Sequence, residues 1–486
     1  MGKYKHLTLL HSNDLHGDFL SKELDEALLG GISMLSGYVN RVRAEVPNTL
    51  YCIAGDMLQG SVIDSEFRGL STIEIMNLLR PDVASIGNHE VDYGLAHLLF
   101  LERCAQFPIV NANLFIKNPY TRLFSPYAIL EVDGMKIMFI GIITNEIMMG
   151  IRKDVLASFV DVEDAAREVG HICNAYRNID IDFTVLLTHI GFEEDKRLAA
   201  LLDPDWGVDV IIGGHTHTIL EKPVEVAGIL IAQAGVGTKQ IGRFDITVDT
   251  DTNAVHDYSW ELIPIDSSHC PRNEVVEQTI RRFKEETDLK YNRVLCQFSH
   301  ALTHPGRYQE TELGNLFTDI LRASLEVDIV LLGSGSIRKQ SIQTLFTYGE
   351  LMEVFPYDDR MLRLMVTGAQ FKRMYRYTLR DEMLEGAHTE FYQYSEGLRV
   401  VFDKANKAFT RFDYNGAPLE DDRLYTIALQ GFHLQNFESC FGFSPSELEA
   451  NGKPRVLTTS VLDVLIEHLP GSQIRSKQVE GRLVIQ

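Results

Sequence analysis

The chain has 486 residues, which is too long for one ordinary hydrophobic core, so two or three domains are expected. An apolar fraction of 45% and a charged fraction of 23% are typical of a folded globular protein and exclude a disordered one. With 46 basic against 68 acidic residues, the formal net charge of −22 argues against a nucleic-acid-binding surface, which would need a basic stripe.

The N-terminus, MGKYKHLTLLHSND, carries only a short apolar run and no small-residue cleavage site, so we expect no secretory signal. No stretch approaches the roughly 18 apolar residues of a membrane span. The six cysteines are scattered and form no CxxC pair. These features predict a cytoplasmic protein in a reducing compartment, without a membrane partner.

Short apolar runs alternate with amphipathic stretches through the first half, a pattern typical of an α/β domain whose sheet lies between helices. We predict strands at Leu7–Leu10, Thr49–Ile53, Val83–Ile86, Lys136–Ile143, Phe183–Leu187 and Val208–Ile212. Between the fourth and fifth of these, Ala165, Val169, Ile172 and Tyr176 recur at helical spacing on one face. From Gly228 to Ile265 the pattern becomes rich in strands.

Residues 273–292 predict one charged helix with few apolar side chains, which suits a connector between domains. Beyond it, a second set of elements is predicted: helices at Thr311–Ala323 and Gly368–Tyr377, and strands at Asp328–Leu332, Gly397–Phe402 and Leu424–Leu429. We therefore expect domains at residues 1–268 and 296–486, joined by a linker helix at 269–295.

Five of the strands in the first half each end next to a residue type that binds metal ions. These residues are Asp14 and His16 after the first strand, Asp56 after the second, Asn88 after the third, His189 after the fifth, and His215 and His217 after the sixth. The carboxyl edge of an α/β sheet gathers its loops, so side chains far apart in sequence are expected to meet there.

Two Asp, one Asn and four His, with no Cys nearby, suit Mn, Fe, Co, Ni or Zn better than Ca or a lone Mg. Two such ions, roughly 3.5–4 Å apart and bridged by one carboxylate, can clamp the attacking and leaving oxygens of an in-line displacement. The set therefore predicts a two-metal phosphoesterase. Taken singly, each residue also has a structural explanation, such as a helix cap for Asp56 or a turn residue for His189.

His89 and Asp92 are three residues apart and lie side by side if a helix starts there. A carboxylate beside an imidazole favours the charged form of the imidazole. A protonated His89 could then stabilise the phosphoryl group in the transition state or protonate the leaving oxygen. The alternative is that Asp92 only caps or orients the helix.

Five segments, HSNDLHG, GDMLQGS, GNHEVDYG, LLTHIGF and GGHTHT, resemble in order the metallophosphoesterase motifs of the bacterial 5′-nucleotidase/UDP-sugar hydrolase family. TELGNLFTD and the stretch from GSGSIR to FPYDD resemble the C-terminal, nucleotide-binding domain of that family. The resemblance implies a four-layer α/β/β/α metallophosphoesterase domain followed by a smaller α/β domain.

The resemblance also implies a role for each residue of the first domain. One ion would be held by Asp14, His16, Asp56 and His217, and the other by Asp56, Asn88, His189 and His215, with Asp56 bridging the two. His89 and Asp92 would form the catalytic dyad.

In the second domain, the resemblance implies five substrate-binding residues. Arg338 matches the arginine of the GGGIR motif, Arg307 matches a substrate arginine of some members, Tyr357 and Phe432 match two aromatic residues that sandwich the base, and Glu438 stands where a ribose- or base-contacting Asp is found. The alternative is that the aromatic residues belong to the core and Arg338 is a surface charge. The motifs also depart from the family here, since PFGN has become Pro356-Tyr357-Asp358-Asp359, and we expect the two acids to alter which base or sugar edges are bonded.

The implied reaction is hydrolysis of nucleoside 5′-monophosphates by a protein whose partner is a small nucleotide. A 2′,3′-cyclic-nucleotide phosphodiesterase or a nucleotide-sugar or dinucleotide pyrophosphatase would use the same ions, and the family also leaves room for hydrolysis of sulfur esters. A nucleotide-binding protein without catalysis is a further alternative, but such a protein should have lost a ligand or the dyad. The oligomeric state does not follow from the sequence.

Overall fold

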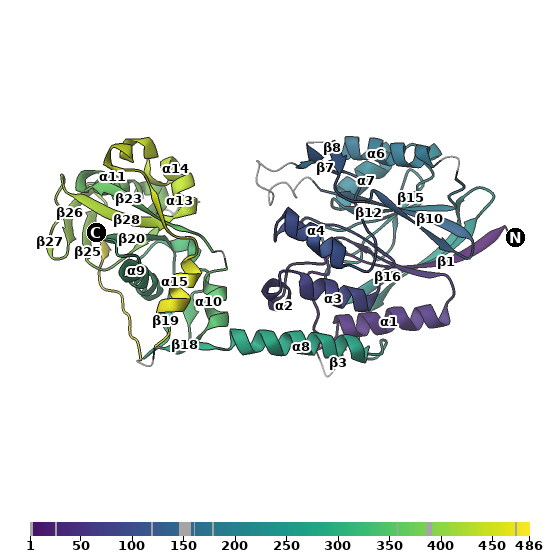
Figure 1. Cartoon of the computed structure of the whole chain (residues 1–486), viewed down its shortest axis with the longest axis horizontal. Helices are drawn as coiled ribbons and strands as arrows, with labels where there is room; N and C mark the ends of the chain where they lie inside the picture. Colours follow the sequence, from purple (N-terminus) through teal and green to yellow (C-terminus); the bar gives the residue numbers. More distant parts are fainter. Residues whose placement is uncertain are drawn as a thin grey trace. The chain divides into compact units, whose positions relative to one another are not determined.

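The computed structural model describes residues 3–24, 27–117, 120–144, 157–159, 161–176, 179–356, 358–384, 391–471 and 474–486. The chain forms two compact units, Met1–Thr287 and Asp288–Gln486 (Figure 1). Within the described residues, no helix has both the length and the apolar character needed to cross a membrane.

Two six-stranded sheets form the centre of the first unit, in the orders β17-β16-β1-β4-β5-β6 and β14-β15-β13-β12-β10-β9. The first sheet contains β1 (Tyr4–Ser12), β4 (Thr49–Ala54), β5 (Val83–Ser85), β6 (Ile109–Val110), β16 (Gln240–Asp249) and β17 (Ala254–Pro264). The second contains β9 (Tyr127–Val132), β10 (Met135–Ile143), β12 (Phe183–His189), β13 (Val210–Ile212), β14 (Val224–Val226) and β15 (Ile229–Ala232). Smaller sheets are formed by β2 (Lys22–Leu24) with β3 (Ala27–Leu29), and by β7 (Leu114–Lys117) with β8 (Tyr120–Arg122) and β11 (Ala157–Phe159).

The two large sheets pack face to face because their strands are apolar on both sides. Leu9 of β1 and Phe139 of β10 are buried in the cluster that the two sheets share. Leu10 and Ile140, the next residues along these strands, are buried in the separate clusters formed with the helices. Successive side chains of a strand point to opposite faces, so a strand covered on both faces needs a nearly continuous apolar run.

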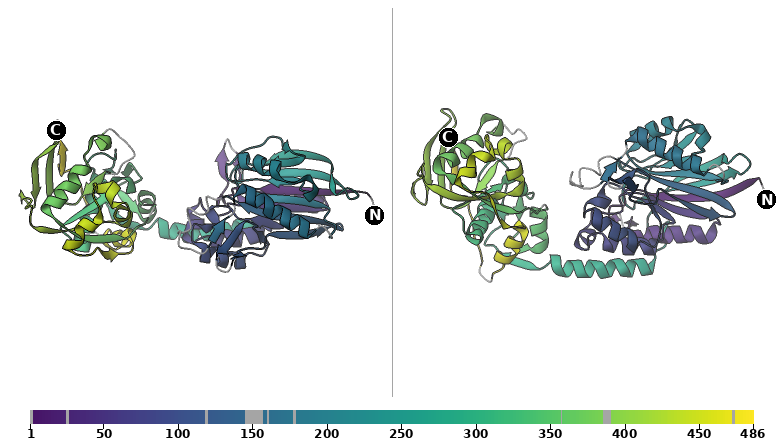
Figure 2. Two further views of the ribbon diagram at one scale, coloured as in Figure 1. Left: turned by 90° about the horizontal axis from the view of Figure 1, so that it is seen from above. Right: turned by 45° about the horizontal axis from the view of Figure 1, so that its top comes forward.

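Helices cover the outer face of each sheet. The first sheet is covered by α1 (Ile32–Glu45), α3 (Leu70–Leu79), α4 (Leu95–Cys104) and part of α8 (Glu274–Tyr291), and the second by α6 (Val162–Ala175) and α7 (Phe192–Leu201). The layers therefore run helix, sheet, sheet, helix, and they can be followed in Figure 1 and in the right-hand view of Figure 2. This confirms the four-layer fold, whereas the expectation from the pattern alone, one sheet between helices, is wrong because there are two.

The helix predicted as a connector is α8, and the greater part of it belongs to the first unit. Val276, Ile280 and Phe283 recur at helical spacing and are buried in the core beneath the first sheet. Arg282 pairs with Glu74 of α3 at 2.5 Å. The border between the units, Thr287 to Asp288, lies inside α8 and inside the predicted linker range of 269–295.

The second unit has a five-stranded sheet, β24-β20-β28-β23-β29, and a four-stranded sheet, β27-β26-β25-β30. Their strands are β20 (Ile329–Gly333), β23 (Met361–Thr367), β24 (Tyr392–Tyr394), β25 (Leu398–Asp403), β26 (Ala408–Tyr414), β27 (Ala417–Pro418), β28 (Leu424–Gln430), β29 (Arg455–Thr458) and β30 (Leu483–Ile485). Two short pairs are β18 (Val294–Gln297) with β22 (Leu345–Thr347), and β19 (Leu302–Thr303) with β21 (Ser341–Ile342). The predicted strands at Asp328–Leu332, Gly397–Phe402 and Leu424–Leu429 correspond to β20, β25 and β28.

Helices cover both faces of the five-stranded sheet. One face packs against α9 (Glu312–Leu325), α10 (Tyr348–Val354) and α15 (Val461–His468), and the other against α11 (Gly368–Tyr377), α14 (Phe437–Phe441) and the second sheet. Two further helices in the described part of this unit are α12 (Asp381–Leu384) and α13 (Gly431–Gln435). The carboxyl ends of the neighbouring parallel strands β20 and β28 lead into the segments that carry Arg338 and Phe432.

Candidate metal centre

All seven predicted metal ligands lie at the carboxyl ends of strands of the first unit. Those after β1, β4 and β5 come from the first sheet, and those at the ends of β12 and β13 come from the second. Among the described residues, the structure places three groups of side chains close enough to hold a metal ion, with all ligand atoms of a group within 4.8 Å of one another: Asp14, His16 and His217; Asp14, Asp56 and His189; and His16, Asp56 and His89. The third group includes His89, which the sequence did not predict as a ligand.

Positive φ angles recur in the backbone of this centre. Five of its residues have them although none is glycine: Asp14 (51°), His16 (48°), Asp56 (51°), His215 (80°) and His217 (54°). Such conformations cost of order 1–3 kcal/mol each and persist only where the surroundings enforce them, which is typical of functional sites. Here they turn five side chains from strand ends toward one another.

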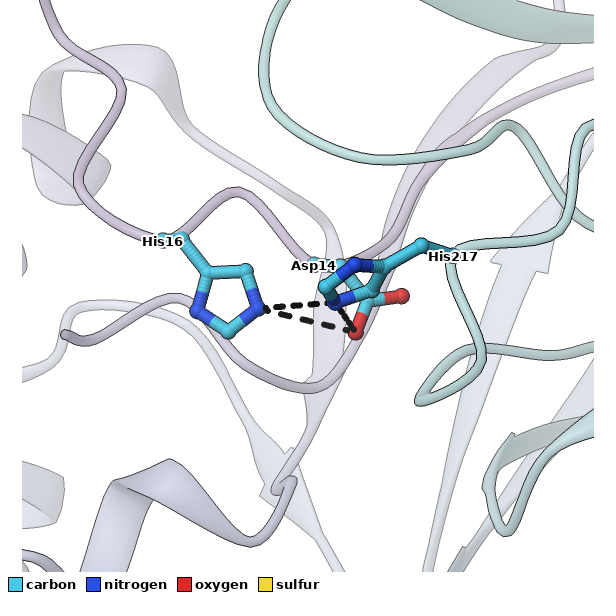
Figure 3. Close-up of side chains that lie close together, drawn as sticks. All are labelled: Asp14, His16 and His217. Carbon is cyan, nitrogen blue, oxygen red and sulfur yellow. Dashed lines mark hydrogen bonds and ion pairs between the residues drawn. The ribbon is translucent and has the colours of Figure 1, made fainter. Parts of the chain in front are cut away.

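Asp14, His16 and His217 come from two loops and point toward one another, as Figure 3 shows. His16 Nδ1 lies 3.0 Å from the carbonyl oxygen of Gln59, which can only accept, so Nδ1 carries the proton. In the neutral ring, His16 Nε2 is therefore an acceptor, yet it lies 3.2 Å from His217 Nε2 and 3.9 Å from Asp14 Oδ1. Acceptors gathered in this way repel one another unless a cation lies among them.

His189 repeats this arrangement in a fully buried position. Its Nδ1 lies 2.9 Å from the carbonyl oxygen of Ala54 and donates to it. Its Nε2 has no hydrogen-bond partner among the described residues, although it lies 3.0 Å from Asp56 Oδ2 and 3.7 Å from Asp14 Oδ1. Burial alone would lower the pKa of His189, but the two carboxylates outweigh it and raise the pKa to about 9. These residues therefore suit divalent metal ions, since imidazole nitrogen and carboxylate oxygen are ligands that bind such ions.

Glycine is required where the loops of this centre approach each other. A Cβ at Gly87 would lie 2.1 Å from Asp56 Oδ1, and a Cβ at Gly55 would lie 2.6 Å from His189 Nδ1. Gly55 also has a φ of +74°. A side chain at either position would push the Asp56 carboxylate or the buried His189 imidazole out of place.

The remaining predicted residues of the first unit border this cluster. Asn88 Oδ1 lies 2.9 Å from His215 Nδ1, which joins the loops after β5 and β13. His89 Nδ1 lies 2.7 Å from Asp92 Oδ2, and the His89 ring lies 5.3 Å from the ring of His16. The hydrogen bond that the His89 ring donates to the Asp92 carboxylate raises the pKa of His89. Asp92 therefore holds the ring and favours its protonated form, while the other ring nitrogen remains available.

Glu90 is a supporting residue that the sequence analysis did not single out. Its buried carboxylate accepts backbone N–H groups from Asp56, Met57, Leu58 and Gly87, at 2.5–3.2 Å. These donors belong to the loop that carries Asp56 and to the turn before Asn88. The only signal in the sequence was its place beside His89 in the GNHE segment.

Replacing Glu90 by Gln should lower metal affinity by about 10- to 100-fold, the usual cost of removing a group that orients metal ligands. The amide NH2 of Gln would face N–H donors that now meet a carboxylate oxygen, so the Asp56 loop would shift. Titration of the stripped protein with Mn or Co measures the change. Glu193→Gln, at an exposed position on α7, is the matched control and should bind metal normally; equal affinity in both variants would contradict this role for Glu90.

The second unit contains a cavity of about 450 Å³ whose lining includes three of the predicted substrate residues, Arg307, Arg338 and Phe432. Phe432 is exposed rather than buried in the core. Tyr357 lies outside the described residues. Glu438 is exposed on α14 and is not among the described residues that line this cavity, so the structure does not bring it to the predicted site.

Two acids, Asp358 and Asp359, also line this cavity, and both accept hydrogen bonds from backbone N–H groups. Asp358 Oδ1 accepts the N–H of Leu462 at 3.1 Å, at the start of α15. Asp359 accepts N–H groups from Arg360 and Phe432, both at 2.8 Å. These bonds give both acids a structural role in the loop, and the expectation that they alter which base or sugar edges are bonded stays a prediction.

Two family models match the chain. The Calcineurin-like phosphoesterase model matches residues 7–218, which include every residue of the metal centre, and the 5′-nucleotidase, C-terminal domain model matches residues 294–442, which include the cavity of the second unit. The first unit is therefore a metallophosphoesterase domain, the class of enzyme that hydrolyses phosphoric esters with divalent metal ions. The chain therefore combines the two domains that these models describe, a calcineurin-like phosphoesterase domain followed by a 5′-nucleotidase C-terminal domain.

Individual relatives resemble the chain over most of its length. Snake venom 5′-nucleotidase of Naja atra is 27% identical over 487 residues, which cover 88% of this chain and 89% of that protein. Endonuclease YhcR of Bacillus subtilis (strain 168) is 26% identical over 88% of this chain, but the match spans only 37% of that longer protein. The structure of the 5′-nucleotidase precursor from Thermus thermophilus covers 99% of both chains, with a TM-score of 0.60 and 25% identity.

Proposed function

We propose that the protein hydrolyses nucleoside 5′-monophosphates to nucleosides and phosphate at a centre of two divalent ions. The observation that carries this proposal is the buried set of imidazole and carboxylate acceptors, in which His189 Nε2 faces Asp56 and Asp14. The match of the second unit to a 5′-nucleotidase C-terminal domain supports a nucleotide as the substrate.

We assign Asp14, His16, Asp56 and His217 to one ion and Asp56, Asn88, His189 and His215 to the other. This donor set of nitrogen and oxygen suits Mn, Fe, Co, Ni or Zn. When bound, a pair of such ions supplies positive charge on both sides of an in-line displacement at phosphorus. The role of the protein is to fix these ligands, which it does through positive-φ turns and through Glu90.

His89 is the group we assign to proton transfer. Asp92 holds its Nδ1 and favours the charged ring, so His89 can donate a proton to the leaving 5′-oxygen. In the second unit, the guanidinium groups of Arg338 and Arg307 suit an anionic oxygen. The exposed ring of Phe432 suits stacking on a base, which is worth about 1–3 kcal/mol.

A substrate panel tests this proposal directly. The protein loaded with Mn or Co is assayed with AMP, a 2′,3′-cyclic nucleotide, UDP-glucose and NAD. We expect AMP to be hydrolysed with the highest kcat/KM and to release one phosphate per nucleoside. Preference for a cyclic nucleotide or a pyrophosphate would reject the 5′-nucleotidase assignment, and no turnover of any ester would reject the reaction class for this chain.

We also propose that the protein acts on free nucleotides in the cytoplasm, without nucleic-acid or membrane partners. Cys52, Cys173, Cys270 and Cys296 are buried and form no disulfide in the described part of the chain, which suits a reducing compartment. Cell fractionation with detection of the native protein tests this location; recovery from the medium or the envelope would contradict it.

A further inference from the structure

Phe432 is a large apolar side chain in an unusual position. It is 59% exposed and lines the cavity of the second unit. The His433 ring, nearly perpendicular to it and 5.4 Å away between centroids, is its one aromatic neighbour among the described residues. A ring with so little packing around it is oriented mainly by its own backbone.

That backbone is held by a carboxylate from a distant segment. Phe432 is the second residue of α13, a helix of only five residues, and Gln430 at its N-cap makes no capping bond with its side chain. Asp359 takes that place, because its Oδ2 accepts the Phe432 N–H at 2.8 Å. Its Oδ1 accepts the N–H of Arg360 at 2.8 Å, and the carbonyl oxygen of Arg360 accepts the N–H of Gly431 at 2.9 Å.

Gly431, the residue before Phe432, leaves room for the Asp359 carboxylate. A Cβ at Gly431 would lie 2.8 Å from Asp359 Oδ1, so a larger residue there would displace Asp359. Gln430 is engaged elsewhere, since its Oε1 accepts the Gly333 N–H at 3.2 Å and the Ser336 hydroxyl at 3.0 Å. The start of α13 is therefore tied both to the 359–360 segment and to the segment that precedes Arg338.

We propose that Asp359 is a positioning residue for the nucleotide: it fixes the Phe432 ring in the cavity and does not read the base. This inference rests on the proposed function and deepens it, because it concerns specificity. Each oxygen of Asp359 accepts one backbone N–H group, and these two bonds direct the carboxylate at the backbone of residues 360 and 432. A ring fixed in this way stacks on any base, since every base has a π face. The pocket should therefore accept purine and pyrimidine nucleotides alike.

The test compares Asp359→Ala and Asp359→Asn with the unaltered, metal-loaded full chain on AMP, GMP, CMP and UMP. Losing a helix cap of this kind should raise the KM of D359A about fivefold to tenfold for all four nucleotides, with kcat little changed. D359N keeps one acceptor oxygen and should lie between D359A and the unaltered chain. Glycerol phosphate, which has no ring to stack, should be hydrolysed equally by all three. Asp421→Ala, an exposed acid that pairs with Lys372 in the same unit, is the control and should behave as the unaltered chain.

The possible negative results of this experiment lead to different conclusions. A KM that rises for one base only would show that Asp359 reads the base, and an unchanged KM for all four would show that it does not position the ring; either overturns the inference. If D359A folds poorly, D359N decides in the same way. If the unaltered chain hydrolyses no nucleotide, the proposed function fails, and calorimetric binding of adenosine then tests the ring position without turnover: unchanged affinity in D359A would overturn the inference.

Discussion

Replacing Asp56 by Asn is expected to lower kcat/KM about a thousandfold and to reduce the metal content from two ions per chain to one or none. Asp56 is the carboxylate shared by the groups that contain His189 and His16, at 3.0 Å and 3.7 Å from their Nε2 atoms. Metal ions supply several kcal/mol of transition-state stabilisation, and each 1.36 kcal/mol is worth a factor of ten in rate. A neutral amide cannot bridge two cations as a carboxylate does.

The measurement for this variant is metal content by plasma mass spectrometry together with steady-state kinetics. Asp251→Asn, an exposed acid on the same unit, is the matched control and should keep both ions and full activity. If D56N kept two ions per chain, Asp56 would not be the bridge, whatever its activity.

Replacing His89 by Ala should lower kcat by about 10²- to 10⁴-fold while leaving both ions in place, because general acid catalysis contributes that much. The loss should be smaller for p-nitrophenyl phosphate, whose leaving group needs little protonation. This difference between substrates separates proton donation from a purely structural role.

His97→Ala is the control for this variant, since His97 is also a half-buried imidazole nearby in sequence, and its ring is bonded to the carbonyl oxygen of Arg68. It should turn over AMP at the normal rate. Loss of metal in H89A would assign His89 to the ligand set, in line with its place beside His16 and Asp56. An equal loss for AMP and p-nitrophenyl phosphate would contradict the assignment as a general acid.

The strands that carry the metal centre were predictable because each is a short, nearly continuous apolar run. Thr49–Ile53 and Lys136–Ile143 fall within one residue of β4 and β10. A continuous apolar run indicates that both faces of a strand are buried, but it does not indicate whether a helix or a second sheet covers each face. Two stacked sheets and one sheet between helices therefore have the same sequence pattern. The packing of α8 was likewise underestimated, because three apolar residues in a charged helix are enough to pack it against the core of the first unit.

The types of the site residues were predictable, but their supports were not. His189 and Asp14 stand at strand ends, where folds of this class gather their ligands. Glu90 was missed because a buried carboxylate that accepts backbone N–H groups leaves no spacing signal. The contact between Asp359 and Phe432 was not foreseen for a related reason: the two residues lie 73 positions apart, and only the fold brings them together.

Anomalous diffraction from crystals grown with Mn or Zn tests the central claim most directly. The structure predicts two peaks roughly 3.5–4 Å apart, with Asp56 between them and His189 and His217 on different ions. A single peak, or peaks away from these side chains, would contradict the two-metal centre on which the proposed reaction depends.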